Sequence, residues 1–267
     1  MERDGAGPGF IGRAIRGVNW RLRSGAQYVQ QQFGSMVFNE RLMRSAESYL
    51  RRYYSHDTDR LWGGRAAPPE WFDHRADLYR FTELRVPFWT ERGVFSREVM
   101  FGGCHVLDLC CGDGFYPYCF YSGTASHIDA VDIDPASIAH ARKWHNRPNI
   151  TFAELDIVKD EFPGTDYDVI VWDGAIEHFS TDNIRSILRK CAKALKAGTG
   201  VVCGYTLIAR SADKSHPEHE HEFTSAAELT ELLREFFPFV GTVETEYTER
   251  HNIYFRAAFQ QERLRRF

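Results

Sequence analysis

The sequence predicts a doubly wound α/β fold, in which a mostly parallel seven-stranded sheet carries helices on both faces and follows an N-terminal helical lid. From Cys104 onward, short apolar runs alternate with helical segments, which is typical of parallel strands joined by crossover helices. The chain has 267 residues, of which 43% are hydrophobic, and this suffices for a large buried core. We therefore expect a core domain over 101–267 and a helical extension with a lid over 1–100.

Each element of this core follows from an apolar run of the right length. Five strands are predicted before the last helix, at Val106–Leu109, Ile128–Val131, Ile150–Ala153, Val169–Trp172 and Val201–Tyr205. The last helix is expected over Ala226–Phe236. Two further strand-like runs end the domain, at about Val240–Tyr247 and Asn252–Phe259.

The N-terminal region is basic and shows helical periodicity. Between Phe10 and Leu22, apolar side chains recur at helical spacing with arginines on the other side, and a second helix is expected over Phe38–Tyr54. A basic amphipathic helix of this kind either packs on the domain or on a partner in a homodimer, which we expect, or makes a peripheral contact with an anionic membrane.

Composition excludes several classes of protein. The net charge of -4 argues against a protein whose main task is to bind nucleic acid through its phosphates. No apolar run is long enough to span a membrane, and the first residues lack the apolar stretch of a secretory signal. The six cysteines show neither zinc-site nor disulfide spacing. A cytoplasmic location is therefore expected.

A glycine turn follows the first strand, in the stretch Val106-Leu-Asp-Leu-Cys-Cys-Gly-Asp-Gly-Phe115. Gly112 and Gly114 allow a sharp turn and a close approach to a ligand, and the helix that follows offers unpaired N–H donors. Taken alone, this turn is weak evidence, because many α/β proteins have one for packing only.

Acidic residues at the ends of the next strands add to this signal. Asp132 stands about 20 residues beyond the glycine turn, where a carboxylate can accept hydrogen bonds from the hydroxyls of a ribose. Asp156 follows the third strand, where it can accept from an adenine amino group. Ligands of open α/β sheets bind at the carboxyl ends of the strands. Together with Asp108, these residues predict a ligand that contains a nucleoside.

These residues resemble the class I S-adenosylmethionine-dependent methyltransferases, over about Phe101 to Phe259. The resemblance implies a Rossmann-like core that binds S-adenosylmethionine and releases S-adenosylhomocysteine. It assigns the glycine turn to the methionine part, Asp132 to the ribose, Asp156 to the adenine and the strand end near Trp172 to the sulfonium. The residues thereby assigned to the cofactor are Asp108, Cys110, Gly112, Gly114, Asp132, Ile133, Asp156, Ile157 and Asp173, with Ile133 and Ile157 flanking the ring.

Two other classes of protein share parts of this pattern. A nicotinamide-dependent dehydrogenase also has a glycine turn followed by a strand-end acid, but its GxGxxG pattern is absent here, and Asp108 would repel a pyrophosphate while it suits a cationic sulfonium. A catalytically silent module would use the fold only to bind a nucleoside or a partner. A silent module would not need the complete set of cofactor-binding residues, yet all of them are present here: Asp108, Gly112, Gly114, Asp132 and Asp156.

Methyl transfer to a hydroxyl needs a base that takes the proton, and histidine is the usual one. His178, in Ile176-Glu-His178, is the first candidate, unless it only caps the next helix or orders the cofactor loop. His219 and His221, in the run His216 to Phe223, are further catalytic candidates. On one face of an extended segment they could bind a divalent metal. An exposed polar loop without a ligand is the alternative, and we expect no metal.

Two further groups of residues complete the candidate site. Trp71, His74, Arg75 and Tyr79 either form the lid, with Arg75 or Tyr79 binding the methionine carboxylate, or pack as an ordinary aromatic helix. His251 and Asn252 either face the pocket or end a hairpin, and we expect the hairpin.

The expected reaction is methylation of a hydroxyl group on a small molecule or glycan. A small-molecule N-methyltransferase is the alternative. Methylation of nucleic-acid bases is disfavoured, because Trp172-Asp-Gly-Ala175 stands where an Asn-Pro-Pro-Tyr motif would follow the fourth strand.

Overall fold

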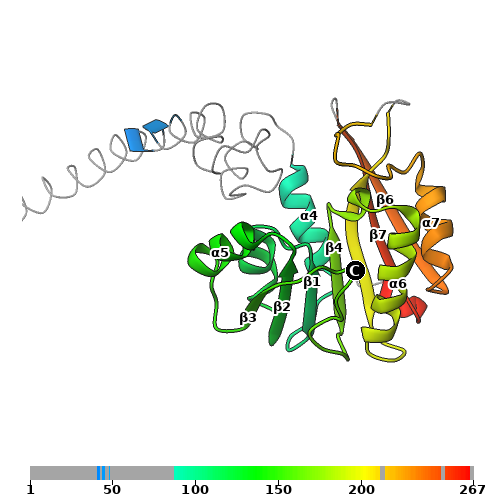
Figure 1. Ribbon diagram of the computed structural model, residues 1–267, viewed down its shortest axis with the longest axis horizontal. Helices are drawn as coiled ribbons and strands as arrows, with labels where there is room; N and C mark the ends of the chain where they lie inside the picture. The colour runs from blue at the N-terminus through cyan, green and yellow to red at the C-terminus, as the bar shows by residue number, and fades with distance from the viewer. Residues whose placement is uncertain are drawn as a thin grey trace, which may run out of the picture. The chain divides into compact units, whose positions relative to one another are not determined.

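The computed structural model describes residues 41, 42, 44, 45, 48, 87–210, 214–247 and 250–264. The chain divides into two compact units, Met1–Pro68 and Pro69–Phe267. In the first unit the described residues are helical, in agreement with the helix predicted over Phe38–Tyr54. The helix predicted over Phe10–Leu22 lies outside the described residues. The sheet belongs to the second unit, whose elements are labelled in Figure 1.

The sheet has seven strands in the order β3-β2-β1-β4-β5-β7-β6. The strands from β1 to β5 pair in parallel, and β7 runs antiparallel between β5 and β6. Their bounds are β1 His105–Leu109, β2 His127–Asp132, β3 Ile150–Glu154, β4 Val169–Asp173, β5 Val201–Leu207, β6 Phe239–Tyr247 and β7 Arg250–Ala258. All seven predicted strands and the mostly parallel, doubly wound sheet are confirmed.

Helices begin where the sequence supplies N-terminal caps. The side chains of Asp134, Ser180 and Ser225 accept backbone N–H bonds at the starts of α5, α6 and α7. The helical elements are α4 Phe88–Arg97, η2 Pro117–Tyr121, α5 Pro135–Trp144, η3 Ile176–His178, α6 Thr181–Ala194, α7 Ala226–Arg234 and η4 Gln261–Leu264. None of the helices in the described part of the chain combines the length and the apolar character that a membrane span requires.

Different helices cover the two faces of the sheet. Leu107 and Leu109 of β1 belong to an apolar cluster that contains side chains of α6 and α7. Val106 belongs to a second cluster, with side chains of η2 and α5. Successive residues of a strand point to opposite faces, so the sheet is the middle of three layers. Figure 1 shows α7 beside β6 and α5 near β3.

Helix α4 lies within the residues that the sequence analysis assigned to the N-terminal extension. Its Glu91 accepts hydrogen bonds from the hydroxyl groups of Tyr254, at 2.9 Å, and Tyr247. Arg256 of β7 donates to the carbonyl oxygen of Phe95 at 3.0 Å. The β6–β7 hairpin thus holds α4 by polar contacts. The predicted boundary between extension and core stays a prediction.

Candidate active site

The backbone after β1 forms a tight turn that includes left-handed conformations. Cys110, Gly112 and Gly114 have φ angles of 57°, 53° and 75°. A Cβ atom at Gly114 would lie 2.7 Å from the ring of Phe152 and 2.9 Å from Cβ of Ala141, so only glycine fits there. Cys110 adopts this conformation with a side chain, which costs roughly 1 kcal/mol or more and is typical of functional loops.

Asp132 at the end of β2 binds this turn directly. Its Oδ2 accepts the N–H of Gly112 at 2.9 Å, and its Oδ1 accepts the N–H of Asp134 at 2.9 Å. Burial raises the pKa of Asp132, although these N–H bonds oppose the rise. The N–H of Ile133 contributes as well, and since a carboxylate offers about four lone pairs, it can still accept a further donor. This geometry suits the ribose contact predicted for Asp132.

Asp108, in β1, lies just before the turn and is buried, with 3% of its surface exposed. Burial raises the pKa of Asp108 well above its usual value, and the neighbouring Asp173 adds to the rise, while the guanidinium of Arg92 opposes it. A cationic ligand beside Asp108 would favour its ionised form. The electrostatics of this site therefore suit the sulfonium or ammonium group of S-adenosylmethionine better than a phosphate.

The residues predicted to surround the adenine differ in their exposure. Asp156 accepts the N–H of Val158 at 3.0 Å and the ammonium group of Lys159 at 2.7 Å, and this lysine lowers the pKa of Asp156. Ile133 is 62% exposed, as a residue covered by a ligand would be. Ile157 is 3% exposed and packs in the core. Because Ile157 exposes so little of its side chain, it offers little surface for the predicted contact with the adenine ring.

Asp173 has a partner that the sequence analysis missed. Arg92 of α4 donates from Nε to Oδ2 of Asp173 at 2.8 Å and from Nη2 to its carbonyl oxygen at 3.1 Å. The guanidinium lies between the rings of Tyr116 and Tyr205, at 4.8 and 4.9 Å from their centroids. A Cβ atom at Gly174 would lie 2.4 Å from Nη2 of Arg92. Asp173 thus anchors α4, and its predicted contact with the cofactor stays a prediction.

The predicted lid residues Trp71, His74, Arg75 and Tyr79 lie outside the described residues. The roles of Arg75 and Tyr79 at the methionine carboxylate stay predictions. Arg92 could not be found by local pattern, because its partner stands 81 positions away.

His178 ends η3, directly after β4. Its ring lies 4.8 Å from that of His219, at an interplanar angle of 84°, and 6.3 Å from that of His216. Ser180, rather than His178, caps α6, since its side chain accepts the N–H of Asn183 at 3.4 Å. The alternative in which His178 caps this helix is therefore wrong, while its role as the base stays a prediction.

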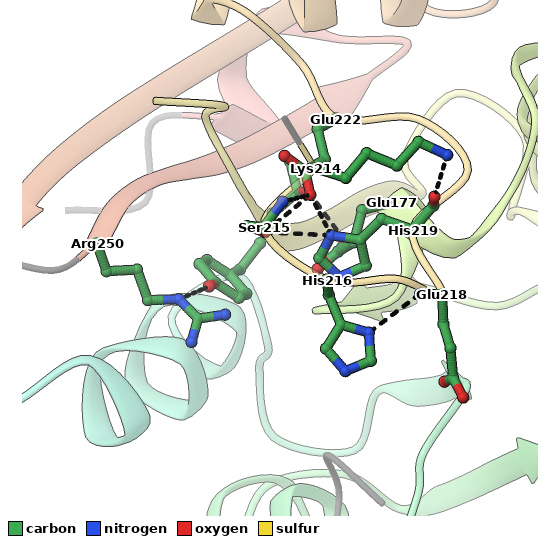
Figure 2. Close-up of polar contacts among 10 residues, drawn as sticks. Glu177, Lys214, Ser215, His216, Glu218, His219, Glu222 and Arg250 are labelled. Carbon is green, nitrogen blue, oxygen red and sulfur yellow. Dashed lines mark hydrogen bonds and ion pairs between the residues drawn. The ribbon is translucent and has the colours of Figure 1, made fainter. Parts of the chain in front are cut away.

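The histidine-rich loop after β5 folds onto the turn that contains η3. The carbonyl oxygen of Glu177 accepts the N–H groups of Glu220 at 2.9 Å and His221 at 3.1 Å. Lys214 donates to the carbonyl oxygen of His219 at 2.6 Å, as Figure 2 shows. His219 is 2% exposed, so the alternative of an exposed polar loop does not hold at this position.

His219 and His221 have different partners. Nδ1 of His219 lies 2.5 Å from Oε1 of Glu222, whereas Nε2 of His221 lies 3.0 Å from Oε1 of Glu228. Burial opposes ionisation of Glu222, but hydrogen bonds from His219 and Ser215 outweigh it and lower the pKa of Glu222. The structure therefore places His219 beside His178, and the metal pair of His219 with His221 considered from the sequence is not formed.

His251 and Asn252 lie within β7 and bond across the hairpin. Nε2 of His251 lies 2.8 Å from Oε2 of Glu244, and Nδ2 of Asn252 donates to the hydroxyl oxygen of Thr245 at 3.2 Å. These contacts agree with the hairpin alternative for both residues.

Residues 106–198 match a family model described as a methyltransferase domain. The matched stretch begins in β1 and includes Asp108, both turn glycines, Asp132, Asp173 and His178. This part of the chain therefore carries the sequence pattern of a methyltransferase domain. No curated protein matches the sequence.

The methyltransferase domain is similar in structure to solved proteins of low sequence identity. An S-adenosylmethionine-dependent methyltransferase from Mesorhizobium loti is 16% identical with a TM-score of 0.52, over 65% of this chain and 98% of that one. The [4+2]-cyclase SpnF is 16% identical with a TM-score of 0.52, over 71% of this chain and 84% of that one. At such identity the likeness shows the fold alone, and a cyclase with this fold illustrates that fold does not fix the reaction.

Proposed function

We propose that this chain is an S-adenosylmethionine-dependent methyltransferase that acts on a hydroxyl group of a small molecule or glycan. The observation that carries the proposal is the junction of the glycine turn with Asp132, where a strained backbone and a buried carboxylate meet at 2.9 Å. In a methyltransferase domain this junction is suited to the ribose and methionine parts of the cofactor. Buried Asp108 supports a cationic ligand.

The place of His178 next to the predicted methyl donor supports a hydroxyl acceptor, because an imidazole can take the proton of a hydroxyl group. β1 and β4 are neighbours, and Leu109 pairs with Trp172 at their carboxyl ends. The glycine turn and the segment that carries His178 therefore leave the same edge of the sheet side by side. His178 would take the hydroxyl proton as the oxygen forms its bond to the methyl carbon. The C–S bond breaks, its electrons stay on sulfur, and S-adenosylhomocysteine leaves.

An amine acceptor is the second candidate, since a neutral amine accepts a methyl group with the same alignment and also loses a proton. A silent binding module is the third, and the match of 106–198 to a methyltransferase domain weighs against it without excluding it. Experiments have to identify the acceptor and to distinguish O-methylation from N-methylation and from binding without catalysis.

Calorimetric titration with S-adenosylmethionine tests the cofactor first. We expect saturable binding, and its absence at millimolar ligand would remove the enzyme hypothesis. Incubation of a metabolite extract with protein and cofactor then tests the acceptor. A hydroxyl compound that gains the mass of one methylene group, dependent on both additions, is the expected result. An amine product would favour the second candidate, and cofactor binding without any product would favour the third.

A further inference from the structure

We propose that Glu177, His178 and His219 bind a divalent transition-metal ion that holds the hydroxyl group of the acceptor. The inference rests on the proposed function for the role of the ion, but the site itself follows from geometry alone. Two segments of the chain build it, the η3 turn after β4 and the loop after β5.

The three side chains converge. One possible ligand atom from each of them lies within 4.8 Å of the others. Around a single ion such atoms stand about 3 to 3.5 Å apart, because each lies about 2.1 Å from the metal. Small side-chain rotations therefore suffice to bring them to one ion. Glu177 is 1% exposed and His219 is 2% exposed, so the cluster is not an accidental surface group.

His219 is oriented as a metal ligand would be. Glu222 accepts the N–H of Ser215 at 2.7 Å and its hydroxyl at 2.8 Å, with Nδ1 of His219 at 2.5 Å from the same oxygen. A carboxylate in this position accepts from His219 only if Nδ1 carries the proton. Nε2 then presents its lone pair on the other side of the ring. Metal-bound histidines are commonly held by such a carboxylate.

Nε2 of His219 is buried and has no hydrogen-bond partner among the residues that the structure describes. Such buried polar atoms are rare, and a bound ion is one of the few ways to satisfy them. Figure 2 shows His219 beside Glu177, with Glu222 and Ser215 on the Nδ1 side.

Glu177 is positioned by the sheet and by the loop. Its Oε2 accepts the hydroxyl of Thr206 in β5 at 3.0 Å, and Thr206 is fully buried. Its carbonyl oxygen accepts two N–H groups of the loop that carries His219. The carboxylate and the imidazole are thus held in a fixed relation by separate hydrogen bonds. Hydrogen bonds of this kind keep metal-binding side chains in place.

The donor set indicates the class of ion. Two imidazoles with one carboxylate suit zinc, cobalt, manganese or iron, whereas magnesium and calcium prefer oxygen ligands alone. Three protein ligands leave positions open for the acceptor oxygen. An ion there lowers the pKa of the bound hydroxyl, whose proton passes to water as the oxygen attacks the methyl carbon. His178 would then serve as a ligand rather than as the base.

The competing interpretation is an ion-free cluster, in which His219 only bonds to Glu222 and packs beside His178. Two other clusters in the described residues must also be separated from this one. His105 and His127 both lie within 3.2 Å of Asp129 at the amino ends of β1 and β2, and Asp113 lies near His140 and His145, so either cluster could hold a metal.

The test uses the full chain freed of metal by a chelator and titrated with Co²⁺ by visible absorption and with Zn²⁺ by calorimetry. We expect one strong site with a cobalt spectrum of nitrogen and oxygen ligation, and much weaker binding of Mg²⁺. His219→Ala and Glu177→Gln should each lower the affinity roughly 10- to 100-fold, and Glu222→Gln, which keeps all three ligands, should lower it about 10-fold.

Two control variants complete the test. His221→Ala, on the same loop but paired with Glu228, should bind metal like the wild type, and so should His127→Ala. Loss of the strong site in His127→Ala with normal binding in His219→Ala would overturn the proposal, as would a wild type that binds no transition metal. Circular dichroism of each variant excludes unfolding as the cause.

The same preparations separate this inference from the proposed function. S-adenosylmethionine is titrated into metal-free and metal-loaded protein. Cofactor binding without a strong metal site refutes the inference and leaves the proposed function standing. A strong metal site lost in His219→Ala, in a protein that binds no cofactor, supports the site and refutes the proposed function.

Discussion

The backbone N–H of Gly112 donates to Oδ2 of Asp132 at 2.9 Å, which joins the turn after β1 to the end of β2. The bond fixes the position of the carboxylate, which can still accept a hydrogen bond from a further donor. Residues 20 positions apart in the sequence thereby act as one element of the candidate cofactor site.

Replacement of Asp132 by Ala should weaken binding of S-adenosylmethionine. Hydrogen bonds to a charged group contribute about 1.5 to 3 kcal/mol, so we expect a loss of roughly 10- to 100-fold in affinity by calorimetry. Asp129→Asn, three residues earlier in the same strand, is the matched control and should bind normally. An unchanged affinity in Asp132→Ala would show that the ribose assignment is wrong.

Gly114→Ala should destabilise the fold. The new methyl group would lie 2.7 Å from the ring of Phe152 at a φ of 75°, so both strain and overlap oppose it. We expect a loss of about 1 to 3 kcal/mol in the free energy of unfolding, measured in urea. Gly123→Ala, whose Cβ would meet no atom within 4 Å, should stay close to the wild type. Equal stabilities of the two variants would contradict the packing described for the turn.

Asp108→Asn should stabilise the cofactor-free protein at neutral pH. Burial, with Asp173 nearby, raises the pKa of Asp108, so the folded state binds its proton more tightly than the unfolded state. The folded state therefore loses stability as pH rises from the ordinary value of 3.8 through the folded pKa, and the amide avoids that loss. A tenfold difference in proton affinity corresponds to about 1.4 kcal/mol.

Unfolding curves at several pH values check this prediction. The difference between Asp108→Asn and the wild type should vanish below the ordinary carboxyl pKa. The same variant should bind S-adenosylmethionine more weakly, because a cationic ligand loses its counter-charge. A variant that is less stable than the wild type at neutral pH would argue that Arg92 already compensates the charge of Asp108.

Arg92→Met should destabilise the protein by about 3 to 5 kcal/mol, because it leaves the buried carboxylate of Asp173 without its counter-charge. The double variant with Asp173→Asn should recover a large part of this loss in urea unfolding. Arg97→Ala, at an exposed position of the same helix, is the control. A double variant as unstable as the single one would show that ring packing, rather than charge, dominates the role of Arg92.

His178→Ala should lower turnover far more than cofactor affinity, whether His178 acts as base or as ligand. Removal of a general base costs about 10²- to 10⁴-fold in rate. Initial rates with the acceptor found by mass spectrometry are compared with the calorimetric affinity. His251→Ala, which removes a histidine that bonds across the hairpin, should keep normal turnover. Normal turnover in His178→Ala would move the chemistry to the loop after β5.

Local patterns predicted the strands, the glycine turn and the strand-end acids correctly. Apart from Asp108, Val106–Leu109 and Val169–Trp172 are apolar, because parallel strands are covered on both faces, and Asp132 is the last residue of its strand. The histidine loop could not be predicted in the same way. Its alternation of His and Glu suggested an exposed segment, whereas His219 is buried because the loop bonds to the backbone of Glu177.

The sequence by itself determined the class of fold and the order of the residues along the sheet edge, because both depend on periodicity and spacing over short stretches. Only the tertiary structure decided that Arg92 pairs with Asp173 and that His219 meets Glu177 and His178. These side chains come from segments far apart in the chain. Which of them meet is set by how the helices and loops pack on the sheet, and no local pattern records that.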